Sequence, residues 1–537
     1  MDFKRNSAKF FLLIFLLIVQ FPLHAQIFPD QPRLVIGIVV DGLQEKHIDL
    51  LWQRFDANGF KKIIEKGTAF ENMEYNIVSA GNASDIATLI TGTTPYYHGV
   101  TGNNFYSRKQ GYVQSVIFDE NEPGIGTKQT VSAHQLLAST ITDELMLTYP
   151  KQSKTYAIAI NAEDAIMLGG HTANSAMWLD DINMKWVTTS YYTDGLAASA
   201  DEMNVNGQIE QYASSVWEPM YSPNTYLFPS ANENKKNGFQ YFPNSKRKGS
   251  NLPILKNTPN ANALVADLAL KIFEKENLGQ DAYPDMLLLQ FNVKTPYEKT
   301  FALKTAEKED MYLRLDKDLQ YLFQKIDSKI GLSNTLIFIL GTQTSAHTPL
   351  ELGENKIPAG YFNGRRSMAL LNTYLMVLYG QERWVEGYYG KNIFLNRQKI
   401  EEKKINLQEI QQVVADFMHE FEGIQSAYTS YQIVNLTDPS NREMSKLRNS
   451  FQKSSKGDVI ITLLPGWLEL DDNNNPIGES NAVISSTPVY FYGWNIEPKK
   501  IATSHSIIDI APTICKILKL PFPNATTGKP LEEIINK

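Results

Sequence analysis

The stretch RLVIGIVVDG, residues 33–42, decides the fold of this chain. It is a continuous apolar run that ends in Asp-Gly, a pattern typical of a strand buried on both faces. Similar runs follow at TYAIAI (155–160), DMLLLQF (285–291), TLIFILGT (335–342) and PVYFYGW (488–494). Amphipathic helical patterns lie between them, the clearest at 311–330 and 406–423. Strands that alternate with helices predict an α/β protein, a three-layer α/β/α sandwich around a largely parallel central sheet.

Two segments depart from this alternation. Residues 200–260 are rich in Asn, Ser, Pro and Lys, which predicts an irregular insertion that forms a cap over the sheet edge. Residues 350–475 are expected to form a second insertion with its own helix and strands. The sequence therefore predicts one large domain elaborated by two inserted cap segments.

The N-terminus has the pattern of a secretory signal peptide. MDFKRNSAK supplies three basic residues, the apolar run FFLLIFLLIVQFPL follows, and Ala25 ends the segment. A membrane anchor is the alternative, but the run of about 14 residues is short for a span that needs about 20. We expect residues 1–25 to be removed as a signal peptide. The mature chain, residues 26–537, would then be periplasmic or secreted, with no transmembrane span.

Charge and cysteine content narrow the function classes further. The 51 Lys and Arg against 58 Asp and Glu give a formal net charge of −7. Nucleic acid is therefore not an expected partner, because its recognition needs a basic footprint. Cys515 is the single cysteine, so no intramolecular disulfide can form and a large core must stabilise the fold. Cys515 lies on an apolar helical face in APTICKILKL, which predicts a buried thiol.

Candidate chemistry gathers at the end of the first predicted strand and in the loop that begins at residue 78. Ligands bind at the carboxyl ends of strands in open α/β sheets, so Asp41 is a candidate metal ligand. The alternative is that Asp41 caps a turn before Gly42. In NASDIATLITG, residues 82–92, Ser84 suits a helix N-cap and Gly92 suits the helix end. Because a helix start attracts anions, this loop is a candidate anion site.

These segments resemble the alkaline phosphatase superfamily, and most closely its phosphate-irrepressible branch near the type I phosphodiesterases and nucleotide pyrophosphatases. The resemblance lies in LVIGIVVDG, GFKKIIEKGTAFEN and TGTTPYYHGVTGNNFY, and it continues through STITDELML, GGHTANSAMWLDD, DMYLRLDKDLQYLF, RWVEGYYGKNIFLNRQKIEEKKI and IIDIAPTICKILKLP. It implies an alkaline phosphatase-like domain over residues 26–537. It also implies hydrolysis of phosphate esters by two zinc ions and a threonine or serine nucleophile.

The family's functional positions, carried over one at a time, lack most of the residues that this chemistry needs. Asp41 keeps the metal ligand of the first strand, and Asn103 keeps the asparagine of the turn. The nucleophile position holds Asn82, whose amide cannot attack phosphorus. The phosphate-clamp positions hold Asn161 and Glu163. The remaining metal-ligand positions hold Thr295, Lys299, Thr342 and Gln343, and no histidine lies between His419 and His505.

The resemblance and these replacements together predict an exported alkaline phosphatase-like pseudoenzyme without a cofactor. Its role would be to bind a small ligand or an unknown protein partner, or to serve in an envelope complex. Lys299 is expected to pair with Asp41 in place of the lost cation, since a buried unpaired carboxylate is costly. The alternative is a divergent metal-dependent phosphomonoesterase or phosphodiesterase with a rebuilt site, which would hold zinc or one hard divalent cation near Asp41.

Other residues offer further alternatives. Ser79 or Ser84 would be a displaced nucleophile in a rebuilt enzyme. A Ca²⁺ or Mg²⁺ ion would be held by Asp41 together with Asp85, Glu163 and Asp164. Otherwise these carboxylates are solvated or cap helices. The sequence favours structural roles for His98, His171 and His347.

Overall fold

The computed structural model describes residues 30–78, 80–231, 238–245, 254–296, 304–345, 349–435, 440–452, 455–471, 473–477, 483–484 and 486–535. The expected signal peptide lies outside these residues, as do Ser79, Lys299 and His347. Within the described ranges, no helix combines the length and the apolar character needed to cross a bilayer.

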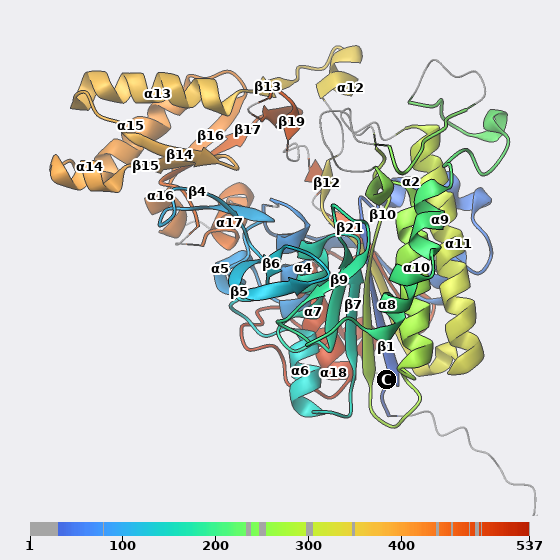
Figure 1. Cartoon of the computed structure of the whole chain (residues 1–537). Coiled ribbons are helices and arrows are strands. Elements are labelled where there is room, and N and C mark those ends of the chain that lie inside the picture. The colour runs from blue at the N-terminus through green and yellow to red at the C-terminus, as the bar shows by residue number, and fades with distance from the viewer. Residues whose placement is uncertain are drawn as a thin grey trace, which may run out of the picture.

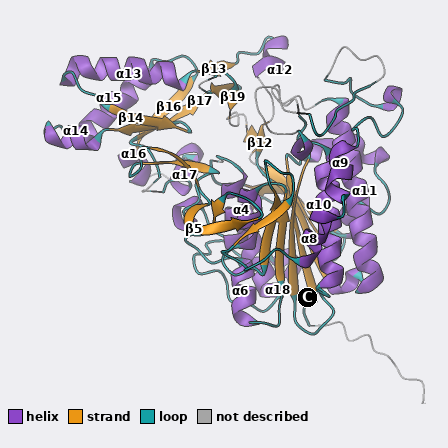
Figure 2. Ribbon diagram, in the orientation of Figure 1, coloured by secondary structure: helices purple, strands orange, loops and turns teal. Residues whose placement is uncertain are grey.

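A twelve-stranded sheet forms the centre of the described chain (Figures 1 and 2). Its order is β22 (Lys499–Ile501), β2 (Thr68–Glu74), β21 (Ser486–Gly493), β11 (Thr335–Gly341), β1 (Leu34–Asp41), β10 (Asp285–Asn292), β7 (Thr155–Ala159), β8 (Ser175–Leu179), β9 (Trp186–Thr189), β5 (Phe118–Ile125) and β6 (Thr130–Val131), and β23 (His505–Ser506) pairs with β2. The five central strands from β11 to β8 are parallel, whereas β21 and β9 are antiparallel to their inner neighbours. The five strands predicted from apolar runs are confirmed as β1, β7, β10, β11 and β21.

Strand β1 is buried on both faces because its apolar side chains alternate between two cores. Leu34, Ile36, Ile38 and Val40 belong to one core, and Val35 and Val39 belong to the other. Helices cover both faces, which confirms the α/β/α sandwich (Figure 2). The first face carries α2 (Glu45–Leu51), α3 (Phe60–Lys66), α8 (Ala198–Val205), α9 (Gln208–Ser214), α10 (Pro259–Lys275) and α11 (Ala306–Lys329). The second carries α4 (Asn82–Thr91), α6 (Ile141–Thr148), α7 (Ala162–Gly169) and α18 (Ile510–Ile517).

Helix α4 begins three residues earlier than the sequence pattern suggests. Its N-cap is Gly81, so the prediction of Ser84 as N-cap is wrong. The Ser84 hydroxyl instead donates to the carbonyl of Gly81 inside the first turn. The prediction for the other end is confirmed, because Gly92 adopts the left-handed conformation that ends the helix.

The described parts of residues 200–260 pack on a helical layer of the sandwich. Helices α8 and α9 contact α10, and Trp217, Phe239 and Tyr241 join the core of that face. A backbone bridge links Trp217 to Tyr241.

Residues 349–470 build a separate lobe, seen at the upper left of Figure 1. Its sheet has the order β14 (Val385–Tyr389), β15 (Asn392–Leu395), β17 (Val459–Leu463) and β16 (Ile424–Thr429). Its helices are α12 (Pro349–Glu354), α13 (Gly364–Tyr379), α14 (Arg397–Glu402), α15 (Leu407–His419), α16 (Ser430–Val434) and α17 (Arg442–Asn449), and β13 (Gly360–Phe362) pairs with β18 (Trp467–Leu470). Helix α15 matches the pattern predicted at 406–423. The lobe has a hydrophobic core of its own, which includes Leu375, Trp384 and Val414.

Candidate functional site

Asp41 ends β1 at the carboxyl edge of the parallel strands, where three side chains contact its carboxylate. The Lys294 ammonium lies 2.7 Å from Oδ2, and the Asn82 amide donates to the same oxygen at 2.8 Å. The Thr342 hydroxyl donates to Oδ1 at 2.9 Å. Burial alone would raise the pKa of Asp41, but Lys294 and these hydrogen bonds hold that pKa below its ordinary value. Asp41 is therefore a buried, ionised carboxylate with a cationic partner.

Asn82 and Asn103 meet at the start of α4. Asn82 is the first residue of the helix, and its side chain points at Asp41. Asn103, from the turn after α5 (Pro95–His98), accepts a hydrogen bond from the backbone N–H of Ala83 at 3.0 Å. It therefore satisfies one of the free amides of the helix start, which the glycine at the N-cap cannot do.

Two further family positions, Thr342 and Gln343, follow directly after β11. Gln343 binds Asp85 twice, through its backbone N–H at 2.8 Å and its side-chain amide at 3.0 Å. Both carboxylate oxygens of Asp85 therefore accept a hydrogen bond from Gln343. Thr295 is buried beyond the end of β10, next to Lys294.

The phosphate-clamp positions lie at the start of α7. Asn161 donates to Asp164 at 3.4 Å. Burial and the neighbouring charges of Asp41 and Glu163 raise the pKa of Asp164 to about 7. Burial also raises the pKa of Glu163. This corner is acidic, and a phosphate dianion placed here would be repelled.

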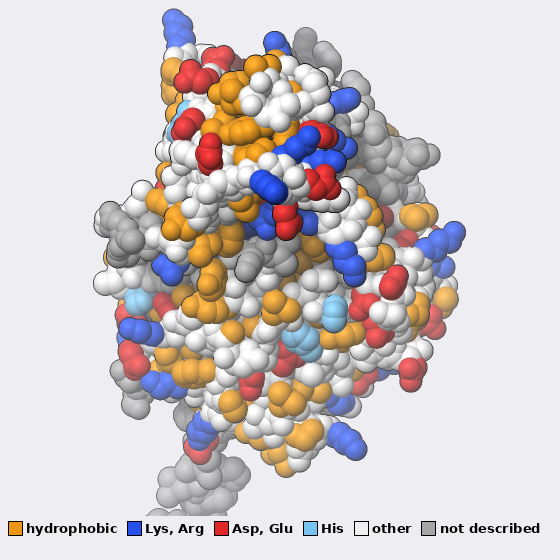
Figure 3. Space-filling model, turned by 90° about the vertical axis from the view of Figure 1, so that its left-hand side faces the viewer, with side chains coloured by type: hydrophobic (Ala, Val, Ile, Leu, Met, Phe, Trp, Pro, Cys, Tyr) orange, Lys and Arg blue, Asp and Glu red, His pale blue; other side chains and the backbone are white. Residues whose placement is uncertain are grey.

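A cavity of about 1710 Å³ opens beside these residues and extends to the second lobe. Its lining includes Asp41, Asn82, Asn103, Asn161, Lys294 and Gln343 from the sandwich. The opposite side is formed by β14, β15, β17 and α17. Figure 3 views the molecule from the left-hand side of Figure 1. It shows Lys and Arg side chains on the surface at the level where the lobe meets the sandwich. Five positions that the sequence analysis selected, Asp41, Asn82, Asn103, Asn161 and Gln343, therefore line one large cleft.

The donors around Asp41 do not fit a zinc site. Zinc takes about four nitrogen, sulfur or carboxylate ligands, whereas Asp41 is surrounded by an ammonium, an amide and a hydroxyl. Within the described chain, no group of three or more His, Cys, Asp and Glu residues could hold a metal ion. The described residues therefore do not form the Ca²⁺ or Mg²⁺ cluster considered for Asp41, Asp85, Glu163 and Asp164.

His98 and His171, for which the sequence favours structural roles, each form hydrogen bonds with neighbouring residues. His98 is fully buried, and its Nδ1 accepts from the backbone N–H of Val100 at 3.2 Å. Its Nε2 must therefore carry the proton, which it donates to the Thr88 hydroxyl at 3.1 Å. His171 contacts Asp143 at 2.8 Å through Nδ1 and the Leu136 carbonyl at 2.9 Å through Nε2.

Sequence reasoning missed Lys294, the cation that contacts Asp41. It selected Lys299, which lies outside the described residues, so the Lys299 pairing stays a prediction. The available signal was that Lys294 follows β10, the strand beside β1. Side chains that leave neighbouring parallel strands at the same edge meet there.

Comparisons with known proteins agree with this architecture. Residues 35–488 match the sequence model of the family described as type I phosphodiesterase / nucleotide pyrophosphatase. The chain is 29% identical to a Myroides odoratus protein named calcium-transporting ATPase, with 95% of each chain aligned. It is 26% identical to the alkaline phosphatase PhoV of Synechococcus elongatus, with 96% of each aligned.

A solved structure extends the similarity to the fold. The crystal structure of the alkaline phosphatase PafA superposes with a TM-score of 0.84 at 25% identity, over 94% of this chain and 99% of that one. The chain is thus a member of the alkaline phosphatase superfamily and belongs to its type I phosphodiesterase / nucleotide pyrophosphatase family.

Proposed function

We propose that this chain is an exported alkaline phosphatase-like pseudoenzyme that binds a ligand in its cleft and does not hydrolyse phosphate esters. The observation that carries the proposal is the set of contacts at Asp41. Lys294 supplies the positive charge that a metal ion would supply in the family's mechanism. A divalent cation would have to displace this ammonium and would meet one carboxylate in place of a full ligand set.

The residues around Asp41 support the same interpretation. Asn82 stands where the family's nucleophile is expected, and an amide nitrogen has no lone pair available for attack on phosphorus. Glu163 and Asp164 place negative charge where a phosphate clamp is expected. Neither activation of a nucleophile nor charge neutralisation of a phosphate follows from these groups.

A binding role is supported by the cleft itself, since its size is ample for a small ligand. Alternatively, the binding role would be directed at a partner protein or exerted within an envelope complex. Helix α13 supports it, because Leu370, Val377 and Leu378 are 49%, 77% and 49% exposed.

The second candidate function is a divergent phosphoester hydrolase with a rebuilt site. It is favoured by the retention of Asp41 and Asn103 and by relatives that are named alkaline phosphatases. Under this alternative, zinc or one hard divalent cation would bind near Asp41.

The test is the zinc content and the hydrolytic activity of purified residues 26–537, with the alkaline phosphatase PafA treated in parallel as a positive control. The protein is incubated with excess Zn²⁺, desalted and assayed with p-nitrophenyl phosphate and bis(p-nitrophenyl) phosphate. We expect near-zero bound zinc and no turnover above buffer. About two zinc ions per chain with turnover of either ester would overturn the proposal.

A further inference from the structure

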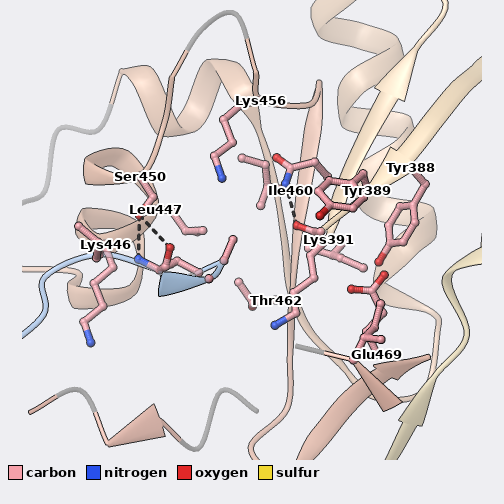
Figure 4. A pocket seen from close by; sticks show the side chains of 18 of the residues that line it. Tyr388, Tyr389, Lys391, Lys446, Leu447, Ser450, Lys456, Ile460, Thr462 and Glu469 are labelled. Atoms are coloured by element: carbon pink, nitrogen blue, oxygen red, sulfur yellow. Dashed lines mark hydrogen bonds between the residues drawn. The ribbon is translucent and has the colours of Figure 1, made fainter. Parts of the chain in front are cut away.

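The cleft contains a second group of cationic residues, away from Asp41 and closer to the lobe. Figure 4 shows the side chains of Lys391, Lys446 and Lys456 around one end of the space. Lys391 comes from the turn between β14 and β15, Lys446 comes from α17, and Lys456 precedes β17. The lobe and the segment beside it therefore supply positive charge to the cleft.

Lys456 is the member of this group whose charge is not matched. Within the described part of the chain, its ammonium has neither a hydrogen bond nor an ion pair. Burial lowers the pKa of this ammonium to about 8, and no charged group contributes to that shift. Lys456 is partly buried, and a partly buried cation without a counter-charge favours the arrival of an anion.

The other charged groups of this region have neighbours other than Lys456. Glu469 faces the Tyr388 hydroxyl and the charge of Lys391 (Figure 4). Lys446 lies in the field of Glu74 and Arg442, and Glu443 accepts a hydrogen bond from the Tyr428 hydroxyl. None of these carboxylates neutralises Lys456.

The backbone that carries Lys456 is fixed on both sides. The Ser455 hydroxyl lies 3.4 Å from the Thr101 hydroxyl of the sandwich. The N–H of Gly457 donates to the Asn392 side chain of β15 at 3.2 Å. The Lys456 side chain therefore starts from a fixed position and points into the cleft (Figure 4). An anchored backbone reduces the ordering cost when an anion binds.

An apolar wall lies beside this ammonium. Leu447 and Ile460 line the cleft and are 4% exposed. Val78 packs on the same small hydrophobic cluster, which also contains Ile433 and Phe451. A ligand at Lys456 would therefore meet an apolar surface next to the cation.

We propose that the cleft binds an amphipathic organic anion, whose carboxylate or sulfonate pairs with Lys456 and whose apolar body lies against Val78, Leu447 and Ile460. The inference deepens the binding role proposed above and rests on it. It names the chemical class of the ligand and places the ligand's charged group near the lobe, away from the acidic corner at Glu163 and Asp164.

The experiment is calorimetric titration of residues 26–537 with octanoate, with octanol as the uncharged comparison and 1-naphthoate as the aromatic one. We expect both carboxylates to bind and octanol to bind at least about ten-fold more weakly, since the charged pair is lost. Stronger binding of octanoate would indicate that the apolar body of the ligand is aliphatic. Stronger binding of 1-naphthoate would indicate that it is aromatic.

Proton uptake separates an ion pair from a merely structural role of Lys456. Titrations at pH 8 in Tris and in HEPES give the number of protons taken up with the ligand. We expect about half a proton, because an ammonium that is half ionised at pH 8 becomes fully charged beside an anion. The affinity is expected to fall about five-fold between pH 8 and pH 9, and about ten-fold per pH unit above pH 9.

Three variants complete the test. Lys456→Met is expected to weaken octanoate binding at least about ten-fold and to abolish proton uptake. Lys456→Arg is expected to keep the binding and lose the uptake, since arginine stays charged. Lys66→Met, at an exposed position of α3, is the matched control and should behave as the wild type. Circular dichroism and the melting temperature check that each variant folds.

Equal binding of octanol and octanoate, unchanged binding by Lys456→Met, or no binding of either carboxylate would each overturn the inference. These outcomes are separable from failure of the proposed function. Zinc uptake with ester hydrolysis and intact octanoate binding would refute only the pseudoenzyme proposal. Absence of both hydrolysis and octanoate binding would refute only the present inference.

Discussion

Asp41 is a buried carboxylate whose charge is balanced by the ammonium of Lys294. Its place at the end of a buried strand and its need for a cationic partner both follow from the sequence pattern. The identity of the partner does not, because Lys294 and Lys299 are both within reach of the same strand end along the chain. The side-chain geometry shows Lys294 as a partner, at 2.7 Å from the carboxylate, whereas the Lys299 pairing stays a prediction. Lys456 has no sequence pattern that distinguishes it from other lysines.

His98 provides a prediction for the pH dependence of stability. Burial lowers the pKa of its imidazole to about 3, whereas the unfolded chain has a histidine of ordinary pKa, about 6.5. As the pH falls below 6.5, the unfolded state takes up a proton that the folded state refuses, so stability is lost between pH 6.5 and 3. Between pH 7 and pH 5, this histidine should remove about 2 kcal/mol of unfolding free energy.

The measurement is urea unfolding of the wild type and His98→Gln at pH 7 and pH 5. The variant should lose about 2 kcal/mol less than the wild type between the two pH values, whatever its stability at pH 7. His134→Gln, at an exposed position, is the control and should keep the wild-type dependence. Equal losses in the wild type and His98→Gln would show that His98 is not held neutral.

At the scale of elements, the sequence predicts strands better than helix starts. The five apolar runs are long enough to be strands and too buried to alternate in polarity, so β1, β7, β10, β11 and β21 could be located within a few residues. The start of α4 could not, because its first turn is capped from a distant turn by Asn103. Local preference favoured Ser84, and the tertiary contact placed the start at Asn82.

The close approach of Gly81 to Asn103 leaves no room for a side chain at residue 81. Gly81 has a φ of +126°, and a Cβ added there would lie 2.3 Å from Asn103 Oδ1. Gly81→Ala should therefore strain the backbone and displace the cap of α4, at a combined cost of about 2–4 kcal/mol. Chemical denaturation measures this cost.

Gly111→Ala is the matched control, since Gly111 also has a positive φ, +75°, but open space around its Cβ position. It should cost about 1 kcal/mol, from the backbone alone. In an Asn103→Ala background, the cost of Gly81→Ala should fall toward that of the control, because the clash is gone. A cost that does not depend on residue 103 would contradict this account of the helix start.

At the scale of the whole molecule, the second lobe stands apart from the sandwich. It has its own four-stranded sheet and its own core, and its contacts with the rest of the chain include those of the hairpin of β3 (Asn104–Ser107) and β4 (Tyr112–Ser115). Arg108 of this hairpin lies 2.6 Å from the buried Asp458 of the lobe. The sequence pattern predicted an insertion with its own helix and strands at residues 350–475, but not the order of its strands, because that order depends on pairing between distant segments.

A lobe with its own core should unfold as a separate unit. We expect two transitions in differential scanning calorimetry. Leu375→Ala removes a fully buried side chain from the lobe, and Leu289→Ala removes one from the sandwich, each at about 2–5 kcal/mol. Each variant should lower the temperature of one transition and leave the other within error. A single transition that both variants shift together would contradict the independence of the lobe.

The burial of Cys515 has a practical consequence for following the two parts of the molecule. The thiol is fully buried in α18, and burial raises its pKa well above that of an ordinary cysteine, so it is a poor target for maleimide reagents. Cysteines introduced at exposed positions of α13 and at the exposed C-terminal end of α10, Glu274 or Lys275, would then be labelled selectively, without prior removal of the native thiol. Fluorescence energy transfer between such labels would report how far the lobe moves from the sandwich when the cleft is filled.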